Sequence, residues 1–262
     1  MRHVALFGCP RSGTSWLGQI FNSAPQVQYR YQPLFSYEFK DWFGRHGLDR
    51  TSLARFHAAL LEARSDFVLQ ALRPPKLAPS VLVWKEVRYH QWIPELLRQP
   101  GLDRLVYLFR RPLDVINSWY LAPREFRAGQ DIRCEYLHAP SKNTDPCEYN
   151  GLARWKASMA MALAAAKQHG ARLQLVSYEQ LRVDPLGHAA VLFDSLDLPL
   201  GDSTRQFLAL STSLHEEDAY SVLRARRTPI ELPADVVQAI EQDAEAEDLL
   251  GAAEMAAQSV SV

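Results

Sequence analysis

The chain has 262 residues, of which 47% are hydrophobic and 23% are charged, the composition of an ordinary globular protein with a sizeable core. With 29 basic and 30 acidic residues its net charge is −1, which excludes a global positive field that would attract nucleic acid or an anionic membrane surface. Any anion site must therefore be local.

Strand-like and helix-like segments alternate through the first half of the chain. In chain order, the pattern of apolar residues predicts a strand at 4–7, a loop at 8–12, a helix at 14–22, a strand at 27–31, a helix at 51–63, a strand at 81–85, a helix at 93–97, a strand at 104–109 and a helix at 112–120. Pro112 suits the first turn of the last of these helices, where its missing N–H costs nothing.

Residues 121–150 interrupt this alternation, because they lack periodicity and are rich in Pro, Gly, Asn and Asp. A long stretch of this kind inside a compact domain is often functional, and we expect a substrate-facing loop or lid. Beyond it the pattern predicts a helix at 152–169, a strand at 173–178, and helices at 185–196 and 233–257. Strands that alternate with helices imply a three-layer α/β fold. We therefore expect one domain over residues 1–262, with a central parallel sheet flanked by helices and ligands at the carboxyl ends of its strands.

Cysteine usage and hydropathy bear on the compartment. The three cysteines (Cys9, Cys134 and Cys147) are too few for a disulfide scaffold, and we expect free thiols. No apolar run reaches the roughly 20 residues of a membrane helix, and the first residues lead into a strand without a signal-peptide pattern. The expectation is a cytoplasmic protein without a membrane span.

The first strand is followed by the sequence GCPRSGTS (residues 8–15) and then by a helix, which is the layout of a phosphate-binding loop. Gly8, Gly13 and Ser15 fit the nucleotide triphosphatase pattern G-x-x-x-x-G-K-[ST], but Thr14 stands where that pattern has lysine. The positive charge comes earlier, at Arg11. A loop of this kind can hold a 5′-phosphosulfate through hydroxyls, backbone amides and one cation, without metal.

The sequence PRSGTSWL (residues 10–17) resembles the 5′-phosphosulfate-binding loop of sulfotransferases that use 3′-phosphoadenosine 5′-phosphosulfate (PAPS). The resemblance is to the P-loop-like sulfotransferase fold of the bacterial or carbohydrate-sulfotransferase kind. It implies that Arg11 contacts the transferring sulfonate and that Trp16 lies against adenine. It also implies a set of residues that hold the 5′-phosphate: Ser12, Gly13, Thr14 and Ser15.

A second segment, RRPLDVINS (residues 110–118), is similar to the family's R-x-P-x-D-x-x-x-S element after a strand, which grips the 3′-phosphate. Arg110 offers a planar fork suited to phosphate, and Ser118 lies two helical turns beyond. Asp114 is expected to stabilise the start of the helix rather than to act in catalysis.

Two weaker resemblances complete the donor site. The segment VSYEQL, followed by Asp-Pro, looks like a family strand end, which makes Tyr178 a candidate neighbour of adenine. A basic cluster containing Arg224 and Arg226 falls where family members reach the 3′-phosphate.

Sulfuryl transfer needs in-line geometry, cations on the developing charge and commonly a general base. Lys85, at the end of a predicted strand, is expected to supply charge. Many family members place a glutamate where this chain has Gln32, and an amide is no useful proton acceptor. The identity of the general base therefore stays open. The candidates are Glu38, Asp41, Glu86 and His90, with Glu86 or His90 favoured.

These residues predict an enzyme that transfers a sulfuryl group from PAPS to a hydroxyl of a small-molecule or carbohydrate acceptor, by in-line displacement and without metal. Aromatic side chains are expected to form an apolar side of the acceptor site: Tyr29, Tyr31, Phe35, Tyr37, Phe39 and Trp42. The alternatives are a P-loop nucleotide kinase or ATPase, and a catalytically inactive nucleotide-binding module. The sequence does not identify the acceptor.

Overall fold

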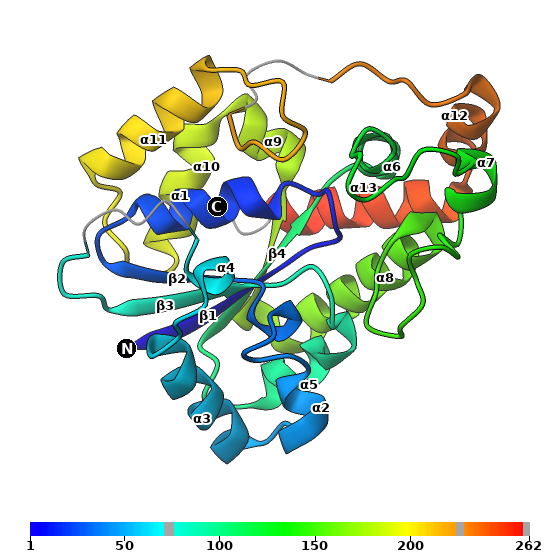
Figure 1. The fold of residues 1–262 in the computed structure, drawn as a ribbon. Helices are drawn as coiled ribbons and strands as arrows, with labels where there is room; N and C mark the ends of the chain where they lie inside the picture. Colours follow the sequence, from blue (N-terminus) through cyan, green and yellow to red (C-terminus); the bar gives the residue numbers. More distant parts are fainter. Residues whose placement is uncertain (71–75, 224–227, 259–262) are drawn as a thin grey trace.

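A five-stranded parallel sheet forms the centre of the protein (Figure 1). The structure is a computed structural model that describes residues 1–70, 76–223 and 228–258. The strand order is β2-β3-β1-β4-β5. The strands span Arg2–Phe7 (β1), Val27–Tyr31 (β2), Val81–Lys85 (β3), Arg104–Phe109 (β4) and Leu173–Ser177 (β5). The predicted parallel sheet is confirmed.

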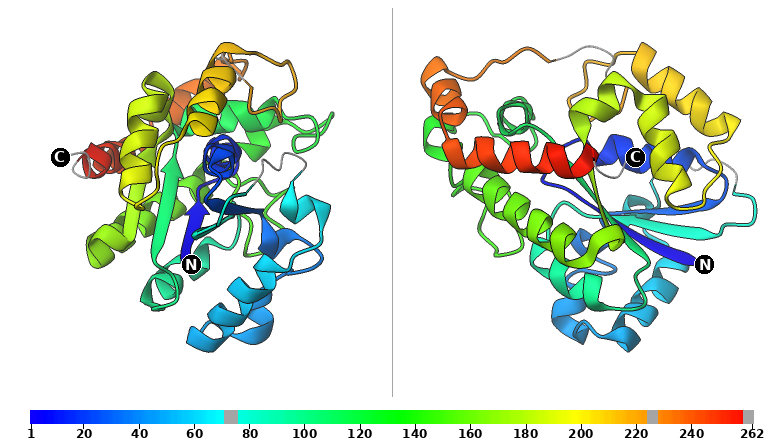
Figure 2. Two further views of the ribbon diagram at one scale, coloured as in Figure 1. Left: turned by 90° about the vertical axis from the view of Figure 1, so that its left-hand side faces the viewer. Right: turned by 180° about the vertical axis from the view of Figure 1, so that it is seen from behind.

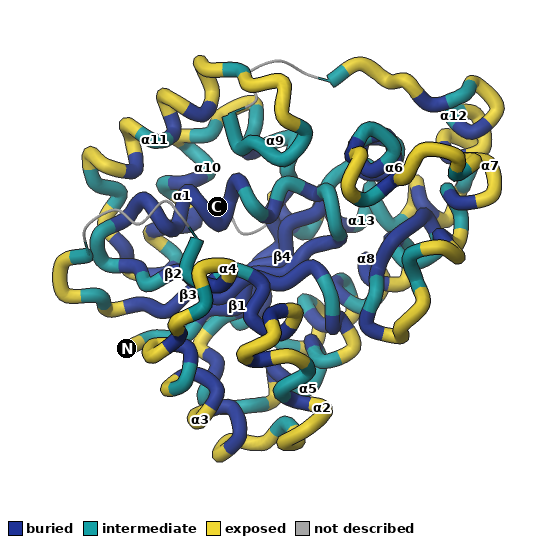
Figure 3. Tube along the Cα trace, in the orientation of Figure 1, coloured by how far each residue is buried: buried dark blue, intermediate teal, exposed yellow. Residues whose placement is uncertain are grey.

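Helices cover both faces of the sheet (Figure 2). The residues of each strand alternate between two hydrophobic clusters, as the pleat requires: Ala5 and Phe7 pack on one face, and Val4 and Leu6 on the other. The first cluster includes residues of α3 (Arg50–Leu61), α5 (Ile93–Arg98), α6 (Pro112–Tyr120), α8 (Gly151–His169), α12 (Ala234–Glu241) and α13 (Ala244–Gln258). The second includes residues of α1 (Thr14–Ser23), α9 (Tyr178–Val183), α10 (Pro185–Asp194) and α11 (Asp202–Ser213). The three-layer α/β architecture follows, with the sheet buried between the helices (Figure 3).

Shorter elements connect these layers. They are η1 (Pro33–Phe35), α2 (Trp42–His46), α4 (Asp66–Leu69), η2 (His90–Trp92), α7 (Ile132–Glu135) and η3 (Gly170–Arg172). Two predictions were wrong in detail. The single helix predicted at 233–257 is two helices that separate at Gln242 and Asp243, and the pattern missed α11.

Residues 121–150, predicted as a substrate-facing loop or lid, contain a short helix and several buried side chains. They contain α7, and the side chains of Phe126, Ile132 and Cys147 are buried. Asn143 and Asn150 bond each other across a turn, with the Asn143 Oδ1 accepting from the Asn150 N–H at 3.1 Å. The segment is thus a packed loop.

The structure bears on two expectations, free cysteine thiols and the absence of a membrane-spanning helix. All three cysteines are free thiols, with Cys134 exposed and Cys147 buried. Among the described helices, none is long and apolar enough to cross a membrane.

Candidate functional site

A cavity of about 740 Å³ opens at the carboxyl ends of the strands. Tyr31 ends β2, Lys85 ends β3, Arg110 follows β4, Tyr178 follows β5, and all four side chains line the cavity. The chain leaves β1 toward β2 on one side, while β4 lies on the other side. The strand order therefore reverses beside β1, which is where open α/β sheets bind ligands.

The loop between β1 and α1 is shaped by its glycines. Gly13 has a φ of 92°, in the left-handed region, and a Cβ there would lie 2.5 Å from the ring of Tyr178. Gly13 is also the N-cap of α1, and no side chain of the described residues caps that helix end. The first amides of α1 are consequently available to an anion.

We expect Gly13→Ala to weaken binding of 3′,5′-adenosine bisphosphate by at least about tenfold and to lower the free energy of unfolding by about 1–3 kcal/mol. Both effects follow from the left-handed φ and from the collision with Tyr178. Calorimetry and urea unfolding measure them. Gly47→Ala is the matched control, since Gly47 has a φ of 74° but its Cβ would meet nothing within 4 Å. Equal bisphosphate affinities for the two variants would contradict the role of Gly13.

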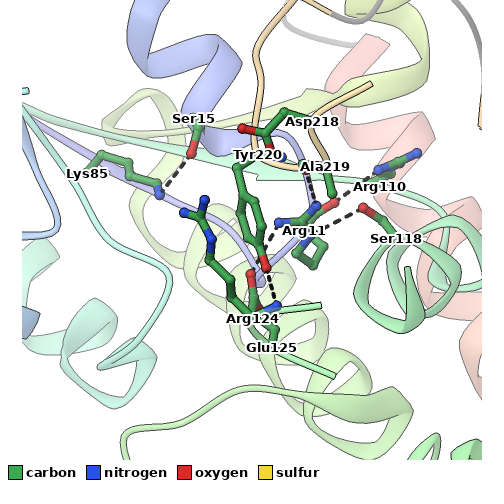
Figure 4. A network of polar contacts seen from close by, with 10 residues as sticks. All are labelled: Arg11, Ser15, Lys85, Arg110, Ser118, Arg124, Glu125, Asp218, Ala219 and Tyr220. Carbon is green, nitrogen blue, oxygen red and sulfur yellow. Dashed lines mark hydrogen bonds and ion pairs between the residues drawn. The ribbon is translucent and has the colours of Figure 1, made fainter. Parts of the chain in front are cut away.

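The Arg11 side chain lies at the centre of the polar contacts (Figure 4). Its Nε donates to Ser118 Oγ at 3.2 Å, its Nη1 pairs with Glu125 Oε1 at 3.2 Å, and its Nη2 donates to the Ala219 carbonyl at 2.7 Å. Arg11 itself has a φ of 69°, an uncommon backbone for a residue with a side chain. Arg11 thus links the loop after β1 to residues 118–125 and to Ala219, which are far from it in the sequence.

Arg110 connects the two predicted nucleotide elements. Its Nη1 donates to the Arg11 carbonyl at 3.0 Å, and its guanidinium lies 4.5 Å from the centre of the Tyr178 ring. The neighbouring Arg111 pairs with Asp114 at 2.6 Å, and its backbone N–H donates to Glu179. Asp114 accordingly stabilises the start of α6.

Trp16 and Tyr178 meet edge to face, with ring centres 5.9 Å apart. Both rings line the cavity. The Trp16 indole N–H donates to Ser211 Oγ of α11 at 3.0 Å. The two aromatic side chains expected near adenine therefore lie together.

The hydroxyl groups of the loop are placed differently. Thr14 and Ser15 line the cavity, whereas Ser12 is buried outside the lining, with an Oγ that has no hydrogen-bond partner within the described part of the chain. Arg224 and Arg226 lie outside the described residues.

Lys85 is 1% exposed and lines the cavity. Its Nζ lies 3.5 Å from Ser15 Oγ and 4.3 Å from the centre of the Tyr31 ring. Burial lowers the pKa of Lys85, while the charges of Tyr31, Glu86 and Glu125 raise it. Lys85 is thus placed to put positive charge beside the loop after β1.

The proposed bases lie elsewhere, which corrects the expectation for Glu86 and His90. Glu86 is fully buried outside the cavity lining, where its Oε1 accepts from the Leu34 N–H at 2.6 Å, and burial raises its pKa to about 8. His90 is fully buried and stacks on Tyr149 at 4.2 Å, and burial lowers its pKa to about 3. Glu86 directly follows β3, and its bond with the Leu34 N–H holds the carboxylate outside the cavity lining.

Neither Glu38 nor Asp41 lines the cavity either. Glu38 accepts from the backbone N–H groups of Arg64 and Ser65. Gln32 does line it, with a φ of 40° that turns the chain after β2.

The aromatic residues expected at the acceptor site separate into two groups. Tyr31 and Phe35 line the cavity, together with Phe67 of α4, whose ring contacts both edge to face. The others do not line it: Tyr29 and Phe39 are buried in the core, Trp42 packs against the core, and Tyr37 is fully exposed.

Sequence reasoning missed the side chains that surround Arg11. The Tyr220 ring lies 5.3 Å from the Arg11 guanidinium and 4.5 Å from that of Arg124, and its hydroxyl accepts from the Arg124 N–H at 2.7 Å. Glu125 pairs with Arg11. These residues belong to no motif. The aperiodic composition of 121–150 was a signal for Arg124 and Glu125, and there was none for Tyr220.

Within the described residues, no group of three or more His, Cys, Asp or Glu side chains could hold a metal ion. The cations of the cavity are arginine and lysine side chains. These side chains can bind an anion that carries several negative groups.

Comparisons with known proteins agree with this chemistry. The sequence model described as "Sulfotransferase family" matches residues 4–202. No curated protein matches the chain significantly. Among solved structures, the sulfotransferase domain of the Synechococcus PCC 7002 olefin synthase is 18% identical, with a TM-score of 0.52, and the match covers 97% of this chain and 94% of that one.

Two further structures have the same fold. A sulfotransferase from Alicyclobacillus acidocaldarius is 14% identical, with a TM-score of 0.56 and coverage of 98% of this chain and 96% of that one. A mouse sulfotransferase complexed with PAP is 12% identical, with a TM-score of 0.55 and coverage of 97% and 89%. At these identities the likeness establishes the fold.

Proposed function

Since the chain belongs to the sulfotransferase family, we propose that it transfers a sulfuryl group from PAPS to a hydroxyl group of a small-molecule or carbohydrate acceptor. One observation carries the proposal: the loop after β1 and the Arg110–Ser118 element meet at one cavity. Arg110 donates to the Arg11 carbonyl, and Arg11 donates to Ser118. A donor with a phosphate at each end of its ribose needs two such anion-binding elements side by side.

The residues present fit that donor. Ser12, Thr14, Ser15 and the first amides of α1 would hold the 5′-phosphate, and Arg110 and Ser118 would hold the 3′-phosphate. Trp16 and Tyr178 would lie beside adenine. The binding of PAP by the mouse neighbour supports this assignment.

Arg11 and Lys85 supply the positive charge that the reaction requires. Negative charge develops on the bridging oxygen as the bond from sulfur to that oxygen lengthens, and preorganised cations stabilise it. Lys85 is fixed by burial and by Tyr31. Fixed cations replace the role that a metal ion has in many phosphoryl transfers, so the proposal needs no metal.

The acceptor would bind at the part of the cavity lined by Tyr31, Phe35 and Phe67. The Arg88 guanidinium lies 3.6 Å from the centre of the Phe35 ring and pairs with Glu148 at 2.7 Å. Apolar rings beside a fixed ion pair suit an acceptor that has an apolar body and a polar group.

We expect 3′,5′-adenosine bisphosphate to bind without metal and about a hundredfold more tightly than AMP, because hydrogen bonds from charged groups to the 3′-phosphate contribute about 1.5–3 kcal/mol each. Calorimetry with the bisphosphate, AMP and ATP·Mg²⁺ measures this. Preference for ATP·Mg²⁺ would contradict the proposal in favour of a kinase or ATPase. Tight bisphosphate binding without turnover of PAPS would indicate an inactive binding module.

A further inference from the structure

The cavity lacks the proton acceptor that the sequence predicted. Gln32 is an amide, and Glu86 and His90 are buried outside the cavity lining. An alcohol acceptor loses its proton during transfer, so a base at the cavity contributes typically 10²–10⁴-fold to the rate. Among the described residues no histidine lines the cavity, so its carboxylates are the candidates for this base.

Four carboxylates of the described residues line the cavity: Asp114, Glu125, Glu148 and Glu179. Asp114 pairs with Arg111 at 2.6 Å at the start of α6, and its side chain is 6% exposed. Glu179 accepts from the Arg111 backbone N–H, beside the proposed nucleotide site. Glu148 pairs with Arg88, which lies over Phe35. Each of these three carboxylates is bonded to Arg88 or Arg111, and neither arginine belongs to the loop after β1.

Glu125 differs because its partner is Arg11, the cation of the loop after β1. Its Oε1 is 3.2 Å from Arg11 Nη1, and its charge raises the pKa of Lys85. Its side chain is 26% exposed, which leaves it accessible to a ligand in the cavity. Figure 4 shows the carboxylate beside Arg11 and Arg124.

The backbone holds Glu125 in place. The N–H groups of Glu125 and Phe126 both donate to the Ala122 carbonyl at 2.8 Å. The buried Phe126 ring packs edge to face against Trp119 and Tyr120 of α6. This turn fixes the carboxylate directly after the helix that carries Ser118.

We propose that Glu125 is the catalytic residue that takes the proton of the acceptor hydroxyl. The proposal rests on the proposed function. The acceptor O–H bond breaks and its proton goes to the Glu125 carboxylate, while the acceptor oxygen bonds to sulfur. The bond from sulfur to the bridging oxygen breaks, and its electron pair stays on the 5′-phosphate of the departing 3′,5′-adenosine bisphosphate.

We expect the partner of Glu125 to change when the donor binds. In this structure the Arg11 guanidinium neutralises the carboxylate. An anionic donor competes for the same guanidinium, and its arrival releases the Glu125 carboxylate from this ion pair. Removing the Glu125 charge should therefore leave the affinity for the bisphosphate unchanged or raise it.

The reverse reaction tests the proposal, with 3′,5′-adenosine bisphosphate as the sulfuryl acceptor and p-nitrophenyl sulfate or phenyl sulfate as the donor. In this direction Glu125 returns the proton to the leaving oxygen. We expect Glu125→Gln to slow transfer from phenyl sulfate by about a hundredfold or more, and transfer from p-nitrophenyl sulfate by less than about tenfold, because p-nitrophenolate leaves without a proton.

The controls separate this proposal from the proposed function. Glu95→Gln changes an arginine-paired glutamate outside the cavity, and its rates should match those of the wild type. Equal losses with both aryl sulfates, or a bisphosphate affinity lowered more than about tenfold, would assign Glu125 to binding and overturn its role as a base. Wild-type preference for ATP·Mg²⁺ over the bisphosphate would instead overturn the proposed function itself.

Discussion

Replacing Arg11 with alanine is expected to lower the rate of sulfuryl transfer from PAPS by about a thousandfold. Arg11 is the cation of the loop after β1, and its three donor groups contact Ser118, Glu125 and Ala219. A guanidinium in a partly buried site is fixed before the reaction begins, so its charge stabilises the transition state without reorganisation. Initial rates of bisphosphate release from PAPS measure the loss.

Arg11→Lys separates charge from geometry. Lysine keeps the positive charge but lacks the planar fork, so we expect transfer to recover to within about ten- to a hundredfold of the wild type. Calorimetry with the bisphosphate gives the accompanying change in affinity. Wild-type turnover in Arg11→Ala would remove Arg11 from the reaction, and equal turnover in the two variants would show that its charge is not what matters.

The sheet and the nucleotide-binding elements were predictable because their signals are local. The strands β1, β3 and β4 each contain a short run of apolar residues, and Gly13 of the loop after β1 stands where the backbone must turn. Arg110 and Ser118 are tied to a strand end and a helix face, so their meeting with Arg11 follows from the topology.

The burial of the two favoured bases could not be predicted from the sequence. Glu86 accepts from the Leu34 N–H, a contact between segments that are far apart in the sequence. For His90 there was likewise no signal, because the 3₁₀ turn that buries it against Tyr149 depends on the packing of residues 147–150.

The surroundings of Arg11 could not be predicted, because they depend on contacts between distant segments. Glu125 follows a helix through a turn held by Ala122, and Tyr220 comes from the segment after α11. Neither Glu125 nor Tyr220 stands at a sequence spacing that is typical of a motif. The order of 121–150 comes likewise from buried aromatic contacts such as that between Trp119 and Phe126.

Glu86→Gln is expected to change the pH dependence of stability. Burial raises the pKa of Glu86 from 4.5 to about 8 in the folded protein, so the folded state keeps a proton that the unfolded state releases above pH 4.5. The free energy of unfolding therefore falls as pH rises from 4.5 to about 8, by roughly 4 kcal/mol in all. Glutamine has no proton to lose and can still accept from the Leu34 N–H.

Urea unfolding of both proteins at about pH 5 and about pH 9 measures the difference. The buried His57 and His90 have pKa values of about 3, so their contribution is present above pH 6.5 and is lost as pH falls. This loss of stability at acid pH is common to both proteins, so subtracting one curve from the other leaves the effect of Glu86 together with that of Lys85, whose pKa the Glu86 charge raises. We expect the stability of Glu86→Gln relative to the wild type to rise between the two pH values, because only the wild type must ionise a buried carboxyl. Parallel curves would mean that the carboxylate is ionised in the folded state, compensated by Lys85 and Arg88, whose charges lower its pKa.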